Sequence, residues 1–378
     1  MTWSPPFEMQ PRLYFYVTQI RNTIFMSRSK RIRFRQLFTI LTAWVLIGVF
    51  ISIYDHLVLL THSSQGVSAD YTFFASLKQN LMSALIGGVL GGSFLVFYIN
   101  IRFQNRPYAH TIMAVVLSFA LIILIIILVK GVMFSHHSPT RSLAYFLQDT
   151  TRVKNILVWF IVVALTQFLL QVSSKVGQNG LGNILRGKYH TPQEENRIFM
   201  FLDLHASTTL AETLGDELYH QLLRDFFADI TDPILNAKGE IYQYVGDEVV
   251  VAWDHVAGVA NNRCVRCYFD ILQNIQSNKE RYIRRYGLVP EFRAGMHSGK
   301  VVAGEVGILK REITYSGDVL NTASRILSKA KEIGAGIVSS STLLGELNFD
   351  DHYTVRTIGP IKLKGKEREV CLTEILLS

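Results

Sequence analysis

The sequence predicts two structural classes in one chain of 378 residues: an N-terminal all-α transmembrane bundle of four helices and a C-terminal α+β domain. Apolar runs with almost no charge lie almost wholly before residue 175. Strand-like and helix-like patterns alternate from Arg197 to Ser378. The composition agrees with a membrane protein, because 49% of the residues are hydrophobic and only 18% are charged.

The net charge of +8 fits two kinds of partner, a nucleic acid or a lipid bilayer. Basic residues gather directly ahead of the first apolar run, at Arg28, Lys30, Arg31, Arg33 and Arg35. Positive residues typically flank membrane helices on their cytoplasmic side, so this placement favours the bilayer and argues against a nucleic acid. Residues 1–36 are therefore interpreted as a basic cytoplasmic arm.

Four apolar runs have about the length, roughly 20 residues, that a helix needs to cross a bilayer. They are Leu37–Tyr54, Leu81–Ile99, Thr111–Val129 and Ile156–Val172, of which the last is the shortest and carries Gln167. We predict a four-helix transmembrane domain over residues 37–174 and a multi-pass protein of the cell membrane. The pairs Gly87-Gly88 and Gly91-Gly92 would allow close contact between helices.

The loops between the runs predict the orientation of the chain. The second loop is short and carries Arg102 and Arg106, whereas the first carries Lys78 alone. The third loop is also basic, which weakens this pattern without reversing it. An even number of spans returns the C-terminal half to the cytoplasm, where nucleotides are. No cluster of ionisable residues lies inside the runs, so a transporter is not expected.

Residues 175–196 are rich in glycine and polar residues, contain Pro192, and are interpreted as a linker with one helical turn at Leu181–Leu185. Residues 197–378 then predict helices packed on a mostly antiparallel sheet. A four-residue repeat from Leu210 to Ile230 predicts one long amphipathic helix. The other expected helices are Val256–Tyr282 and Val319–Lys331, and the expected strands are Ile198–Leu204, Glu240–Val245, Val249–Trp253, Phe292–His297, Val301–Val306, Glu312–Tyr315 and others near the C-terminus.

Two aspartates are candidate metal ligands. Alternation along the first strand places Phe199, Phe201 and Asp203 on one face, so Asp203 ends an apolar row. Asp247 lies in the tight turn of the next hairpin, and both carboxylates can reach one point if the strands pair. Such oxygen ligands, with phosphate oxygens, suit Mg²⁺ or Mn²⁺. The alternative is that Asp203 caps the following helix and Asp247 is only a turn residue.

Other residues are candidate phosphate contacts. Ala206, Ser207 and Thr208 open a helix whose free N–H groups could bind phosphate, although, taken alone, these residues fit ordinary N-capping by Ser207 or Thr208 better. Asn321 and Arg325 lie four residues apart beside the apolar stripe of one helix, where Arg325 suits a phosphate and a solvated face is the alternative. Lys364, the first residue of Lys364-Gly365-Lys366, suits a phosphate contact or a simple β-turn.

Together these elements resemble the class III nucleotidyl cyclases. The segments that carry the resemblance, in family order and spacing, are FMFLDLHASTT, YQYVGDEVVVAW, RAGMHSGKVVAGEVG, ITYSGDVLNTASRI and KLKGK. They cover essentially all of residues 197–378, and the combination is highly specific. The four-helix half is similar to anchors of bacterial members, although its pattern is much less specific.

The resemblance implies a palm-like, ferredoxin-like domain that acts as a homodimer and converts ATP to cyclic AMP and pyrophosphate. It implies that Asp203 and Asp247 hold two Mg²⁺ or Mn²⁺ ions per site. Asn321 and Arg325 match the pair that orients the ribose and stabilises the transition state. Lys364 matches the triphosphate-binding lysine.

One position departs from the family pattern. The lysine that selects adenine in typical adenylyl cyclases is replaced by Gln243, whereas its partner position holds Thr314, which is within the pattern. Guanylyl cyclases typically have Glu and Cys at these positions, and this chain has neither. The resemblance therefore implies ATP as substrate, with guanylate cyclase or dual specificity as the alternative.

Two further alternatives are weaker. A diguanylate cyclase would share the turn around Gly246-Asp247-Glu248, but it would not explain Asn321 and Arg325. A catalytically silent nucleotide-binding receptor module is disfavoured because the aspartates, Asn321, Arg325 and Lys364 are all retained.

Overall fold

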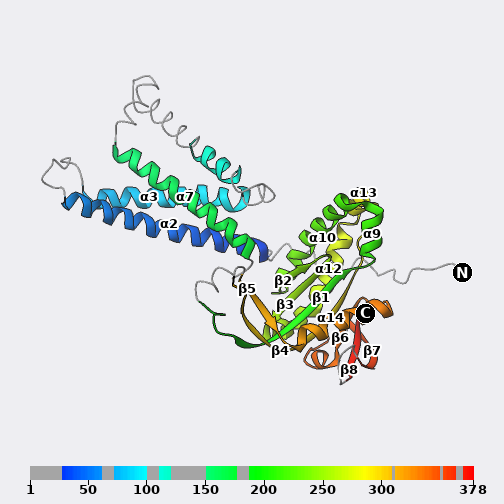
Figure 1. The fold of residues 1–378 in the computed structure, drawn as a ribbon. Coiled ribbons are helices and arrows are strands. Elements are labelled where there is room, and N and C mark those ends of the chain that lie inside the picture. Colours follow the sequence, from blue (N-terminus) through cyan, green and yellow to red (C-terminus); the bar gives the residue numbers. More distant parts are fainter. Residues whose placement is uncertain are drawn as a thin grey trace. The chain divides into compact units, whose positions relative to one another are not determined.

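The computed structural model describes residues 28–61, 72–99, 110–120, 150–176, 187–308, 311–349, 352–362 and 369–378 (Figure 1). Residue contacts divide the chain into two compact units, Lys30–Gln178 and a unit that contains Asn179–Ser378. The first unit is helical and the second is built on a β-sheet, so the predicted change of structural class along the chain is present.

The described part of the first unit consists of apolar helices. They are α2 (Arg28–Thr61), α3 (Phe73–Ser93) with its π-helical continuation (Phe94–Ile99), a short helix (His110–Ala120) and α7 (Thr150–Val176). Among the described residues, three stretches are long and apolar enough to cross a membrane, namely Arg31–Leu59, Ser76–Ile99 and Ile156–Ser173. The predicted run Thr111–Val129 continues beyond the described residues, so the four-helix bundle stays a prediction.

Small residues bring α3 close to α2. A Cβ atom on Gly88 would lie 2.7 Å from Cδ2 of Leu41, and one on Gly92 would lie 3.0 Å from Cδ1 of Leu37. Larger residues at these glycines would require the Leu41 and Leu37 side chains to move. The glycine pairs therefore do permit the close contact that the sequence indicated.

A buried tryptophan and a few polar pairs connect the helices of the first unit. The Trp44 indole donates a hydrogen bond of 3.0 Å to the Thr166 hydroxyl of α7. The Asn80 amide of α3 donates one of 2.9 Å to Ser52 of α2. Because polar groups buried among apolar helices need partners, these bonds fix the pairing of the helices.

The second unit is built on an eight-stranded sheet in the order β2-β3-β1-β4-β6-β8-β7, with β5 paired to β4. Every pairing is antiparallel except that of β4 with β6, which confirms the mostly antiparallel sheet. The strands are β1 (Gln193–Leu204), β2 (Glu240–Val245), β3 (Glu248–Asp254), β4 (Phe292–Val306), β5 (Glu312–Ser316), β6 (Ile337–Ser340), β7 (Tyr353–Ile361) and β8 (Val370–Leu377).

Helices cover both faces of this sheet (Figure 1). Alternate residues of β1, including Ile198 and Met200, pack in one core with α10 and α12. The intervening residues Phe199 and Phe201 pack in a second core with α14. The helices are α9 (Ser207–Leu214), α10 (Asp216–Asn236), α11 (His255–Val259), α12 (Arg263–Ser277), α13 (Lys279–Tyr286), α14 (Asp318–Ile333) and α15 (Ser341–Leu344).

Two predicted helices and two predicted strands were wrong in their extent. The long helix from Leu210 is interrupted at Gly215, whose φ of 75° ends α9 before α10 begins. The helix predicted over Val256–Tyr282 is broken into α11, α12 and α13, with Asn262 at a φ of 51° between the first two. The predicted strands Phe292–His297 and Val301–Val306 form the single strand β4. Gly299, between them, is paired within the sheet, and its lack of a side chain leaves room for Val319 of α14.

Candidate active site

The two candidate metal ligands converge where β1 ends and β3 begins, at one end of these neighbouring strands. Asp203 lies near the end of β1, and its Cα partner on β3 is Glu248, which directly follows Asp247. Asp247 occupies the two-residue turn between β2 and β3, where Gly246 has a φ of 64° that other residues rarely adopt. The strand alternation and the tight turn together bring the two carboxylates into contact range.

These carboxylates have unmet hydrogen-bonding capacity. Oδ1 of Asp203 and Oδ2 of Asp247 are both buried, and neither has a hydrogen-bond partner among the described residues. Burial raises the pKa of Asp203, the ammonium of Lys331 lowers it, and the adjacent Asp247 raises it further, with a net shift upward. Two buried oxygens without donors are costly unless a cation binds them. The donor set therefore fits a hard divalent cation with oxygen ligands.

Lys331 and Glu248 belong to this cluster, although sequence reasoning missed them. The Lys331 ammonium, in the last turn of α14, donates to Oδ2 of Asp203. Burial raises the pKa of Glu248 to about 6, and the negative charge of Asp203 adds to the shift. No pattern in the sequence pairs Lys331 with Asp203, because their contact depends on how α14 crosses the sheet.

Helix α9 begins beside the carboxylates with free N–H groups. Its N-cap residue is Ala206, at a φ of 54°, and no side chain caps the helix. The first helical hydrogen bond runs from Leu210 N–H to Ala206 O at 2.9 Å, which leaves the N–H groups of Ser207 and Thr208 without an intrahelical acceptor. The geometry therefore disfavours the capping explanation and leaves the phosphate explanation open.

Asn321 and Arg325 lie on α14 beside its packed face. Ala323 and Leu327 are buried against the sheet, whereas Asn321 is exposed and Arg325 is half-buried. Neither side chain has a hydrogen bond or ion pair with the part of the chain that the structure describes. Both side chains are thus available to a ligand or to a second chain.

Gln243 and Thr314 lie on strands that are not neighbours in the sheet. Gln243 is exposed on β2, and Thr314 lies on β5 opposite Gly304. The rings of their neighbours Tyr242 and Tyr315 nevertheless pack edge-on with centroids 5.0 Å apart, so the two strands are linked. Lys364 lies outside the described residues.

The fold defines the second unit as an α+β domain with a mostly antiparallel sheet and paired carboxylates at one edge. Residues 190–374 match the family model described as the adenylate and guanylate cyclase catalytic domain. This domain of the chain belongs to the class III adenylyl and guanylyl cyclase family, as the resemblance of its motifs indicated.

Curated relatives include adenylate cyclases. "Adenylate cyclase 2" of Rhizobium meliloti (strain 1021) is 36% identical over 208 residues, which are 55% of this chain and 57% of that protein. The "Adenylate cyclase" of Anabaena cylindrica is 28% identical over 210 residues, which are 53% of this chain and 40% of that protein. The chain thus spans less than two thirds of the length of these relatives.

A solved structure of a bacterial light-regulated adenylyl cyclase has a similar fold. It superposes with a TM-score of 0.52 over 61% of this chain and 67% of that one, at 18% sequence identity. This likeness supports the fold alone.

Proposed function

We propose that the chain is a membrane-bound adenylate cyclase that converts ATP to cyclic AMP and pyrophosphate. The observation that carries the proposal is the pair of unpartnered buried oxygens on Asp203 and Asp247. A pair of carboxylates that lacks donors beside a helix start with free N–H groups suits a metal-bound triphosphate. The family of the domain and the activity named for its relatives support the same reaction.

Asp203 and Asp247 would hold Mg²⁺ or Mn²⁺, two ions per site. A metal ion held there would lower the pKa of the ribose 3′-hydroxyl and neutralise charge on the phosphates. In the proposed reaction the 3′-oxygen forms a bond to the α-phosphorus, the bond between the α-phosphorus and the bridging oxygen breaks to release pyrophosphate, and the hydroxyl proton passes to solvent. The N–H groups of Ser207 and Thr208 bind phosphate oxygens and orient the α-phosphorus for this attack.

Asn321 and Arg325 would act on the sugar and on the developing charge. The Asn321 amide orients the ribose, and the Arg325 guanidinium stabilises negative charge at the phosphorus in the transition state. Lys364 would bind the triphosphate. Gln243 and Thr314 would recognise the base. The adenylate cyclases among the relatives support ATP as the preferred substrate. Because an amide and a hydroxyl can each donate or accept, measurable use of GTP is also expected. A guanylate cyclase is the alternative.

The active unit would be a homodimer with shared sites. Asn321 and Arg325 have no partners within the described chain, which supports a role toward the nucleotide held by the aspartates of the partner chain. A symmetric dimer then has two equivalent sites. Anchoring in one membrane would raise the effective concentration of the two domains.

The membrane proposal places both termini in the cytoplasm of a multi-pass protein. The three apolar helices support anchoring, and the basic residues before the first one support the orientation. Reporter fusions at residues 65 and 378 should report opposite sides of the membrane. Reports from the same side would contradict this topology.

The purified full-length protein, assayed with Mn²⁺ and either ATP or GTP, tests the function directly. We expect cyclic AMP as the main product and pyrophosphate in equal amount, identified by mass spectrometry. Only cyclic GMP would support the guanylate cyclase alternative. Nucleotide binding without either cyclic product would support a silent binding module.

A further inference from the structure

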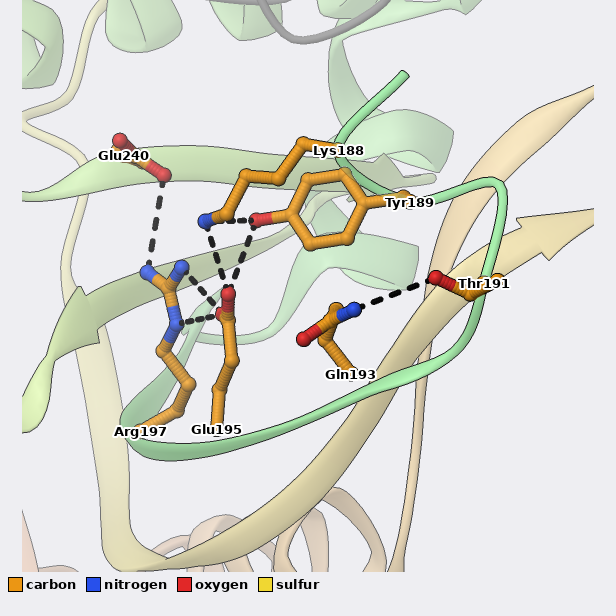
Figure 2. Close-up of polar contacts among 7 residues, drawn as sticks. All are labelled: Lys188, Tyr189, Thr191, Gln193, Glu195, Arg197 and Glu240. Carbon is orange, nitrogen blue, oxygen red and sulfur yellow. Dashed lines mark hydrogen bonds and ion pairs between the residues drawn. The ribbon is translucent and has the colours of Figure 1, made fainter. Parts of the chain in front are cut away.

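An ion-pair network encloses Glu195 at the start of β1 (Figure 2). Its Oε1 accepts hydrogen bonds from Lys188 Nζ at 2.9 Å and from the Tyr189 hydroxyl at 3.3 Å. Its Oε2 accepts two from Arg197, from Nε at 2.8 Å and Nη2 at 2.6 Å. The side chains of Arg197 and Glu195 are only 9% and 15% exposed, so this two-bond contact holds the guanidinium in one orientation.

The other side of the Arg197 guanidinium faces an aromatic cluster. Its central carbon lies 5.4 Å from the ring centroid of Tyr315, within the range of a cation–π interaction. The Tyr315 ring packs edge-on against Tyr242 at 5.0 Å and Phe199 at 5.4 Å. The Tyr315 N–H also donates a hydrogen bond of 3.3 Å to the Tyr242 hydroxyl. Arg197 thus joins the network around Glu195 to the tyrosine pair.

The tyrosine pair adjoins both residues proposed to recognise the base. Tyr242 precedes Gln243, and the N–H that its hydroxyl binds belongs to the peptide group between Thr314 and Tyr315. The ladder between β2 and β3 shifts register between Ile241 and Gln243, so Tyr242 has no paired residue there. Side-chain contacts rather than sheet pairing therefore position Tyr242.

The segment before β1 also packs behind Thr314. Gly304 is the β4 partner of Thr314, and a Cβ atom on Gly304 would lie 3.5 Å from Cγ of Pro192. The next residue, Glu305, donates its N–H to the carbonyl of Tyr189 at 3.1 Å. Contacts from residues 189–197 thus reach two neighbours of Thr314, namely its β4 partner Gly304 and the adjacent Tyr315.

We propose that Arg197 is a positioning residue for selection of the nucleotide base, acting through Tyr315 and Tyr242 on Thr314 and Gln243. This inference rests on the proposed function, because it takes those two residues as the base contacts. Arg197 touches no base itself. Without its guanidinium, the Tyr315 ring loses a charged neighbour and the Glu195 carboxylate loses two donors, so the backbone at Thr314 gains freedom. A polar base edge is discriminated only by groups held in place.

A second arginine with the same chemistry provides a matched control. Arg281 forms an ion pair with Asp229 and lies 5.0 Å over the ring of Tyr282. These residues belong to α10 and α13, and in the described chain none of their hydrogen bonds, ion pairs or ring contacts reaches Gln243 or Thr314. Arg281→Ala therefore removes an arginine of the same kind without a route to the base.

The test compares the full-length wild type, Arg197→Ala, Tyr242→Phe and Arg281→Ala in detergent. Calorimetry with non-cyclisable ATP and GTP analogues gives the ratio of the two dissociation constants. We expect Arg197→Ala to shift this ratio by about tenfold, and Tyr242→Phe, which loses only the accepting hydroxyl, by roughly threefold. Arg281→Ala should leave the ratio unchanged even if it lowers the unfolding temperature.

Two results would overturn the inference. One is a ratio within about twofold of wild type in both Arg197→Ala and Tyr242→Phe. The other is an equal shift in Arg281→Ala, which would indicate general loosening. If Arg197→Ala does not fold, Arg197→Lys keeps the charge but loses the planar two-bond contact and, with Tyr242→Phe, decides the question. Because binding needs no chemistry, product formation by the wild type tests the proposed function separately.

Discussion

Two nearly buried carboxylates at opposite ends of β1, Glu195 and Asp203, differ in their partners. Their side chains are 15% and 11% exposed. Glu195 accepts four hydrogen bonds from three residues, whereas Asp203 contacts Lys331 and keeps one oxygen without a partner. A buried carboxylate with all its hydrogen bonds made (a saturated carboxylate) indicates a structural role, whereas one with an unpartnered oxygen (an unsaturated carboxylate) indicates a ligand-binding role. Burial alone therefore does not distinguish these two roles.

The pKa shifts of the two groups have opposite directions. Burial by itself raises the pKa of Glu195, but the hydrogen bonds and charges of Lys188 and Arg197 more than offset it, and the net shift is downward. Burial raises the pKa of Asp203, and the contact with Lys331 does not cancel the effects of burial and Asp247. Each carboxylate can therefore be tested by removing its charge, with different consequences expected.

The largest effect is expected at the unsaturated end. Asp247→Ala should lower kcat by at least about 10³-fold with Mg²⁺, because one proposed metal ligand is lost. The variant should not unfold more easily, since it also removes a negative charge beside Asp203. Steady-state kinetics and thermal unfolding measure the two effects.

Asp232→Ala is the matched control, because Asp232 is exposed on α10 away from the cluster. It should keep wild-type activity. Wild-type turnover of Asp247→Ala with Mg²⁺ would contradict the two-metal proposal.

The second prediction tests whether Asp203 of one chain and Arg325 of a partner chain form one active site. Mixing the inactive variants Asp203→Ala and Arg325→Ala should restore about a quarter of wild-type activity, because half of the dimers are mixed and each has one intact site of two. Mixed dimers are counted by two different affinity tags. Failure to recover activity despite proven co-assembly would mean that each chain builds its own site.

The sequence predicted the end of β1 that carries Asp203 better than the end that carries Glu195. Asp203 and Asp247 depend on strand alternation and a two-residue turn, which are local patterns. The network around Glu195 was hidden, because residues 175–196 were interpreted as a linker whereas β1 already begins at Gln193. Its contacts depend on β2 and β5, which lie far along the chain.

The helical breaks were also hidden from the sequence. Gly215 interrupts an apolar repeat that continues in step on both sides, so periodicity alone predicted one helix. The face of α14 was predicted well, since Ala323 and Leu327 are buried as their spacing indicated. Lys331 was missed as a site residue because its contact with Asp203 joins positions 128 residues apart.

At the saturated end, Glu195→Gln should lower the free energy of unfolding of the catalytic domain by about 1–3 kcal/mol, because buried charged donors lose their partner. Turnover should fall much less than in Asp247→Ala. The pKa of Glu195 is lower in the folded than in the unfolded protein. The charged carboxylate therefore stabilises the fold fully at pH values above the unfolded-state pKa. This stabilisation is lost as the pH falls through the folded-state pKa.

Urea unfolding at several pH values measures this contribution. The difference between wild type and Glu195→Gln should be constant near neutral pH and shrink as the solution becomes strongly acidic. A difference that grows on acidification would contradict a downward pKa shift. Glu332→Gln, whose exposed carboxylate pairs only with Lys329 among the described residues, should show almost no difference at any pH.

The smallest effect concerns the one cation that Asp203 contacts in the described chain. Lys331→Met should tighten Mn²⁺ binding severalfold, about three- to tenfold, because the metal no longer competes with a half-exposed ammonium. The same variant should be less stable than wild type in a chelator, where Asp203, Asp247 and Glu248 would then lie together without a positive charge. Electron paramagnetic resonance of free Mn²⁺ measures affinity, and thermal unfolding with and without metal measures stability. Lys329→Met, on the same helix but paired with Glu332, should change neither. Weaker Mn²⁺ binding by Lys331→Met would mean that the ammonium helps to orient Asp203 for the metal. Asp203, like Glu195, would then depend on a basic partner for its position, and the two carboxylates would differ only in the number of partners.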